Sequence, residues 1–190
     1  MRWFDPLLDV LFPRSCLACG RDLCGGPWPW LCPACLARIE PPPPFPCPVC
    51  AGPLGPFAMP SACASCRRLR PRFDACVAAG GYEGTLGELV VRMKYGKDAD
   101  LAWPLGELLA DTLRLWAPLR EVDVVVPVPM RFMKRVRRGF NQSEALAAEV
   151  ARRLSLHLYR FVLRRGRAGP AQAGLTLAKR LVAQRRSMVV

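Results

Sequence analysis

The chain has 190 residues, a formal net charge of +13 and 52% hydrophobic residues. This length allows one ordinary domain, or a small metal-stapled domain and a compact one, and the hydrophobic content excludes a disordered chain. Residues 1–113 carry 11 basic and 11 acidic side chains, whereas residues 114–190 carry 17 and 4. The whole excess lies in the last part, which favours phosphate-rich partners. A solvated arginine-rich surface is the simpler alternative.

No segment reaches the roughly 20 apolar residues of a membrane span. The opening stretch, residues 1–13, is interrupted by Asp5 and Asp9, and no small-residue cleavage site follows it. We therefore expect a cytoplasmic protein with no membrane span and no secretory signal. Thiols stay reduced in that compartment, so paired cysteines there indicate metal binding rather than disulfides.

Eight of the ten cysteines form four Cys-x-x-Cys pairs, and their spacing repeats. Twelve residues separate the first pair from the second, and twelve separate the third from the fourth. Two such pairs supply the four sulfur atoms of a closed tetrahedral site, so we predict two structural zinc ions. The predicted ligands are Cys16, Cys19, Cys32, Cys35, Cys47, Cys50, Cys63 and Cys66.

Several alternatives for these cysteines stay open. Sequential pairing is the simplest assignment, but interleaved pairing and iron–sulfur ligation are compatible with the spacing. A redox Cys-x-x-Cys needs one pair beside a βαβ unit, not four in Pro-rich loops. A closed Cys₄ site leaves no position for water, so we expect no metal catalysis. Of the two remaining cysteines, Cys24 is a possible competing ligand, and Cys76 lies in an apolar run and is expected to be buried.

The rest of the chain predicts an alternation of strands and helices, typical of an α/β domain. The expected elements are a strand at residues 74–82, a helix capped by Thr85 and ending near Lys94, a helix over residues 101–115, a strand at residues 122–128 and a helix from Asn141. The apolar run at residues 122–128 is typical of a strand buried on both faces.

A basic loop is expected between that strand and the helix that starts at Asn141. A strand, a basic loop and a helix N-terminus make the geometry of an α/β anion site, and an ordinary connection with exposed arginines is equally compatible. The single histidine, His157, has no cysteine or carboxylate cluster nearby, so we assign it no ligand role. The candidate nucleic-acid or phosphate contacts are Arg131, Lys134, Arg135, Arg137, Arg138, Asn141, Gln142, Arg164, Arg165 and Arg167.

The sequence as a whole resembles the ComF family of competence proteins, which are similar to type I phosphoribosyltransferases. The resemblance rests on the cysteine pairs, on Val126-Pro127-Val128-Pro129 and above all on Arg138-Gly139-Phe140-Asn141-Gln142. Shorter matches are Phe12-Pro13, Lys94-Tyr95-Gly96 and the later Gln172, Leu175 and Arg180. The resemblance implies an N-terminal double zinc ribbon, residues 1–72, followed by a type I phosphoribosyltransferase-like α/β domain, residues 73–190.

The chain departs from the family pattern near its end. Ala183 stands where the family usually has Asn, and no segment resembles the phosphoribosyl-pyrophosphate loop, Asp-Asp-x-x-x-Thr-Thr-Gly-x-Thr. We therefore expect a family member whose C-terminal part is missing, and no binding of phosphoribosyl pyrophosphate by this chain. Whether the chain is an enzyme stays open.

The resemblance implies a competence accessory protein that assists the uptake and handling of single-stranded DNA, with other DNA-uptake proteins as further partners. Two alternatives remain. The first is a phosphoribosyltransferase, if the full-length protein carries the missing loop. The second is a zinc-ribbon module for protein interaction.

Overall fold

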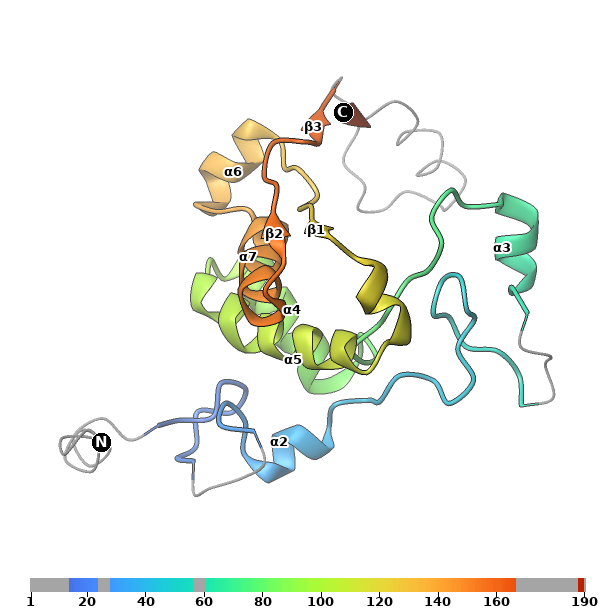
Figure 1. The fold of residues 1–190 in the computed structure, drawn as a ribbon. Coiled ribbons are helices and arrows are strands. Elements are labelled where there is room, and N and C mark those ends of the chain that lie inside the picture. Colours follow the sequence, from blue (N-terminus) through green and yellow to red (C-terminus); the bar gives the residue numbers. More distant parts are fainter. Residues whose placement is uncertain (1–13, 24–27, 57–60, 167–187, 190) are drawn as a thin grey trace. The chain divides into compact units, whose positions relative to one another are not determined.

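The computed structural model describes residues 14–23, 28–56, 61–166 and 188–189. The chain divides into two compact units, Met1–Arg92 and Met93–Val190 (Figure 1). The sequence boundary between residues 72 and 73 stays a prediction. Several residues named above lie outside the described ranges: Asp5, Asp9, Phe12, Pro13, Cys24, Arg167, Gln172, Leu175, Arg180 and Ala183.

The first unit contains the same backbone turn twice, which agrees with the repeat in the cysteine spacing. In the first copy, the Cys16 N–H donates to the Arg21 carbonyl over 2.7 Å, and in the second the Cys47 N–H donates to the Gly52 carbonyl over 2.7 Å. The matching isolated β-bridges are Ser15–Asp22 and Pro46–Pro53. The two turns therefore share one hydrogen-bond pattern.

A short helix completes each copy: α2 (Pro33–Ala37) in the first and α3 (Ala64–Leu69) in the second. Cys32 and Cys63 are the extended N-cap residues of these helices. In the second copy the N-cap sulfur also accepts the Cys66 N–H, over 3.4 Å. Each helix thus starts at one cysteine of a pair and carries the other inside its first turn.

Residues 74–82 form no strand, so the sequence prediction is wrong there. The Gly81 N–H donates to the Glu40 carbonyl over 2.8 Å, and a Cβ at Gly80 would lie 2.9 Å from the same oxygen. The two glycines let this segment run close along the backbone at Glu40 instead of pairing with a second strand. Cys76 is consequently exposed rather than buried as predicted, because no sheet face covers it.

The helix α4 (Gly84–Tyr95) begins one residue before its predicted cap. Gly84 has φ +63°, and a Cβ there would clash with the Arg38 carbonyl, so this position requires glycine. Thr85 lies buried inside the first turn rather than capping it. Glu88, in the same turn, forms an ion pair with Arg38 over 2.6 Å.

In the second unit, the helices α5 (Ala102–Arg114) and α7 (Gln142–Leu154) pack against each other. A short 3₁₀ turn, η1 (Ala99–Leu101), precedes α5, so the helix predicted at residues 101–115 is present with shifted ends. Leu105 and Ala110 on α5 are buried, as are Val150 and Ala151 on α7. These apolar side chains form the core of the unit.

A minimal parallel sheet lies beside these helices. The strand β1 (Val124–Val125) pairs with β2 (His157–Leu158) in parallel, and the α6–α7 segment connects them. The strand predicted at residues 122–128 is therefore much shorter, since Pro127 and Pro129 have no N–H to donate to a sheet. A second pair, β3 (Arg164–Arg165) and β4 (Met188–Val189), is antiparallel.

The predicted basic loop after β1 is a helix. The helix α6 (Phe132–Arg138) follows an extended N-cap at Arg131 and ends at Gly139, which has φ +86°. Lys, Arg and Met are good helix formers, and glycine is favoured in the left-handed conformation that ends a helix. None of the side chains of α6 is buried. None of the helices in the described residues combines the length and apolar character that a membrane span requires.

We predict that Gly106→Ala destabilises the second unit by about 1–3 kcal/mol, although alanine is the better helix former. A Cβ at Gly106 would lie 2.6 Å from the Cβ of Glu149, so α5 and α7 would have to separate. Urea unfolding measures the loss. Gly55→Ala, where a Cβ meets nothing within 4 Å, is the control. Equal stability of the two variants would contradict this packing.

The stability of the second unit should also depend on Glu149 at acid pH. The pKa of Glu149 is lowered by the Arg152 guanidinium, against the effect of burial, and further by Arg153. A lowered folded-state pKa adds stability above the unfolded value of about 4.3, and this stability is lost as the pH falls through the folded pKa.

Glu149→Gln should therefore lower the free energy of unfolding by about 1–2 kcal/mol at neutral pH, and by less at acid pH. Urea midpoints at both pH values test this, with the exposed Glu121→Gln as the control. A deficit independent of pH would refute the assignment.

Candidate metal centres and anion site

The structure brings the eight paired cysteines together in two groups of four. Within each group, the sulfur atoms all lie within 4.8 Å of one another. The groups follow chain order, as in the simplest assignment, and are not interleaved: Cys16, Cys19, Cys32 and Cys35, then Cys47, Cys50, Cys63 and Cys66. All nine cysteines in the described part of the chain are free thiols, so no disulfide competes there.

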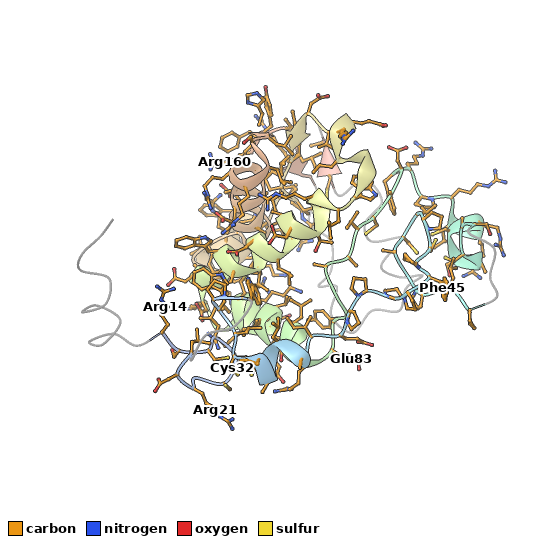
Figure 2. All side chains as sticks on the ribbon, turned by 60° about the horizontal axis from the view of Figure 1, so that its bottom comes forward. Arg14, Arg21, Cys32, Phe45, Glu83 and Arg160 are labelled. Atoms are coloured by element: carbon orange, nitrogen blue, oxygen red, sulfur yellow. The ribbon has the colours of Figure 1, made fainter. Side chains whose placement is uncertain are left out.

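The distances in each group fit a tetrahedral ion. The sulfurs of Cys19 and Cys32 lie 3.8 Å apart, as do those of Cys50 and Cys63 (Figure 2 labels Cys32). Zn–S bonds of about 2.3 Å place tetrahedral sulfur ligands about 3.8 Å apart, whereas a disulfide requires about 2 Å. Both groups can therefore hold a metal ion in a closed Cys₄ site.

In each group, backbone N–H groups stabilise the thiolate form of one cysteine. Burial raises the pKa of Cys16, but N–H groups, first that of Cys32, outweigh it and lower the pKa to about 6. Burial raises the pKa of Cys35 to about 12. Cys47, lowered to about 6, and Cys66, raised to about 12, repeat the pattern. A divalent cation would favour the thiolate form at every ligand.

In the second unit, the start of α7 is fixed to the chain that leaves β1. The Asn141 side chain caps α7 as predicted, accepting the Ser143 N–H over 3.2 Å, and its amide donates to the Val128 carbonyl over 3.2 Å. The Val128 N–H donates to the Ser143 hydroxyl over 2.9 Å. A strand end and a helix N-terminus thus lie together, which is the geometry of an α/β anion site.

Two motifs that are far apart in the sequence meet beside this helix start. The Arg138 guanidinium lies 5.0 Å from the ring centroid of Tyr95, within cation–π range, and donates to the Gln142 side chain over 3.2 Å. Gln142 in turn donates to the Lys94 carbonyl over 3.5 Å. Tyr95 is 69% exposed. The sequence indicated Tyr95 through the Lys94-Tyr95-Gly96 match to the family, which assigned it no role in binding.

Positive charge gathers around Lys134. Partial desolvation lowers the pKa of Lys134, and repulsion from Arg138 lowers it further. Tyr95 opposes this, and weaker repulsion from Arg165 and Arg131 adds to it. The buried Nε of Arg165 has no hydrogen-bond partner among the described residues. An anion placed here would supply the missing acceptor and relieve the repulsion. We call Lys134, Arg138 and Arg165 the cationic cluster.

Other predicted site residues are placed differently. Glu144 on α7 pairs with Arg135 over 3.5 Å and with Arg160 over 3.3 Å, and Figure 2 labels Arg160. Arg135 is therefore partly neutralised, by an acid that sequence reasoning had not linked to it. Arg137 and Arg164 are exposed.

Several curated proteins are similar to the chain, and three of them represent the set. The chain is 28% identical over 155 residues to Competence protein F of Haemophilus influenzae, which covers 79% of this chain and 65% of the relative. It is 29% identical over 142 residues to DNA utilization protein YhgH of Salmonella typhi, covering 73% and 61%. The protein of that name from Escherichia coli K12 is 28% identical over 143 residues, covering 74% and 61%.

These similarities support the resemblance to the ComF family. The chain spans less than two thirds of the length of the curated relatives named above. No family model and no solved structure matches the chain. The phosphoribosyltransferase-like architecture of residues 73–190 therefore stays a prediction, while the two Cys₄ groups agree with a double zinc ribbon.

The purified chain should contain two metal ions, one for each group. Cys16→Ser and Cys47→Ser should each reduce the metal content by one ion per chain, because serine is a poor replacement for a thiolate ligand. Elemental analysis of native and variant proteins measures this. Cys76→Ser, at an exposed cysteine outside both groups, is the control. Full metal content in either ligand variant would disprove its group as a metal site.

Proposed function

We propose that this chain is a competence accessory protein that handles single-stranded DNA in the cytoplasm and carries two structural zinc ions. The names of its relatives, Competence protein F and DNA utilization protein, support a role connected with DNA. Other DNA-uptake proteins are further proposed partners. We assign it no transfer reaction, since the sequence given contains no Asp-Asp-x-x-x-Thr-Thr-Gly segment.

The cationic cluster is the observation that carries this proposal. Phosphate groups supply most of the affinity of proteins for nucleic acids, and arginine and lysine are their usual partners. Arg138 on α6 and Arg165 on β3 both repel Lys134, and the buried Arg165 Nε has no acceptor among the described residues. A phosphodiester oxygen would reduce the repulsion between these cations and accept the hydrogen bond of the Arg165 Nε.

Tyr95 adds a means of binding the bases. Its ring is mostly exposed, and Arg138 lies over it. Base stacking on aromatic rings contributes about 1–3 kcal/mol per base and is available only where bases are unpaired. The combination of cations with an exposed aromatic ring therefore favours a single strand over a duplex.

The strand end beside the α7 N-terminus also suits the phosphate of a small molecule such as phosphoribosyl pyrophosphate. This is the second candidate function. Competition distinguishes the two: phosphoribosyl pyrophosphate should not displace a labelled oligothymidylate from this chain. Displacement at concentrations where inorganic pyrophosphate has no effect would favour the phosphoribosyl ligand instead.

Lys134→Gln should weaken the binding of single-stranded DNA through the loss of one phosphate contact. The slope of log affinity against log salt should fall by about 0.7, which corresponds to about fivefold in affinity at about 0.1 M salt. Fluorescence anisotropy with labelled oligothymidylate across a salt series measures both. Arg120→Gln removes an equal charge from an exposed site outside the cluster and is the control. Identical curves for the two variants would rule out the cluster as the DNA site.

A further inference from the structure

Each Cys₄ group, with the turn and the short helix that carry it, is called a cysteine unit. The first and second cysteine units share a backbone pattern but differ in the residues that lie beside them. After α2, Ile39 forms a β-bridge with Gly84 and Arg38 pairs with Glu88, so the end of this helix is occupied by α4. The corresponding positions, counted from Cys35 and Cys66, are Leu69 at the end of α3 and Arg70, its C-cap. Both are exposed, and neither forms a bridge or an ion pair within the described ranges.

The second cysteine unit carries a local positive charge that does not appear in the charge count for residues 1–113. Between residues 41 and 73 there are four arginines and no acidic residue. A Cys₄ site with one divalent ion has two net negative charges, so this stretch keeps a net charge of +2. The four arginines are Arg67, Arg68, Arg70 and Arg72.

Three of these guanidinium groups are exposed and have no partner in the described part of the chain. Arg67 donates to the Ala62 carbonyl over 2.7 Å, which ties it to its own unit. Arg68, Arg70 and Arg72 make no such bond. Arg70 ends α3 in the left-handed conformation with φ 44°, so the chain changes direction between Arg68 and Arg72.

Exposed apolar rings accompany these cations. Phe73, directly after Arg72, is 50% exposed, and Phe45, two residues before the first cysteine of the unit, is 52% exposed (Figure 2 labels Phe45). Leu69 at the end of α3 is 44% exposed. Arginines next to aromatic rings are typical of surfaces that hold the phosphates of a single strand and stack its bases.

We propose that the described residues of the second cysteine unit, 45–56 and 61–73, form a separate binding surface for single-stranded nucleic acid. The guanidinium groups of Arg68 and Arg72 contact backbone phosphates, and Phe73 stacks on a base. The surface rests on the proposed function only for the nature of its ligand, because none of its residues belongs to the cationic cluster. The first cysteine unit has no comparable role, since α4 occupies the matching positions.

The test uses the full chain and the double variant Arg68→Gln/Arg72→Gln, which leaves both Cys₄ groups intact. Affinity for labelled oligothymidylate should fall by about fivefold for each contact at about 0.1 M salt, and the salt slope by about 1.4. Metal content should stay at two ions per chain, which excludes loss of the site. Arg14→Gln/Arg21→Gln, at exposed arginines of the first cysteine unit, is the matched control.

Comparison with Lys134→Gln separates this inference from the proposed function. Loss of affinity in both variants supports both surfaces. Loss in Lys134→Gln alone overturns the surface on the second cysteine unit, and loss in the arginine double variant alone overturns the cationic cluster. No binding of oligothymidylate by the unmodified chain overturns both.

The stacking part has its own readout. Phe73→Leu should weaken binding to oligothymidylate but leave unchanged the binding to an abasic deoxyribose-phosphate strand of equal length. Equal losses on both strands would contradict stacking. Poly-glutamate, added at equal charge, should displace the strand less well than unlabelled oligothymidylate does. Equal displacement would mean that the surface takes any polyanion, an acidic protein segment included, and would overturn its assignment to nucleic acid.

Discussion

The convergence of four sulfur atoms in each cysteine unit is the constraint on which the first part of the chain depends. Among the described residues from 14 to 73, the buried side chains are four cysteines and Leu31. So small an apolar core cannot offset the conformational entropy of ordering these loops. Structural zinc in small peptides contributes about 10–16 kcal/mol, and in such a unit this binding free energy is folding free energy. The metal sites therefore take the place of a hydrophobic core.

The repeated cysteine spacing explains why the two cysteine units fold alike. The residues outside the repeat explain why their surfaces differ. Gly20 in the first turn and Ala51 in the second both have positive φ, so the conformation is kept even where the residue is not glycine. Four cysteines that converge on one point, and the turn hydrogen bonds that aim them, cannot vary freely. The residues that follow each helix are under no such constraint. In the first cysteine unit the residues after the helix contact α4, and in the second they include arginines.

The sequence predicted the features that depend on local chemistry and failed where long-range partners decide. Cysteine spacing indicated both Cys₄ groups because each knuckle needs only neighbouring residues, and the cap at Asn141 is equally local. The strand at residues 74–82 failed because its backbone runs against Glu40. The basic loop became α6 because helix propensity outweighs the charge repulsion that suggested a loop. The ion pairs of Glu144 were invisible since they join three separate segments.

Summed charge is a poor guide to where a polyanion binds, because the field that a phosphate meets is local. Exposed charges more than about 8–10 Å apart are screened from one another at physiological salt. The single carboxylate of Glu144 pairs with both Arg135 and Arg160 and offsets one of their two charges, whereas Lys134 lies among cations. The balanced first part, by contrast, contains an arginine-rich stretch whose compensating acids lie elsewhere in the sequence. Local charge therefore supports two candidate cationic surfaces where the net charge indicated one.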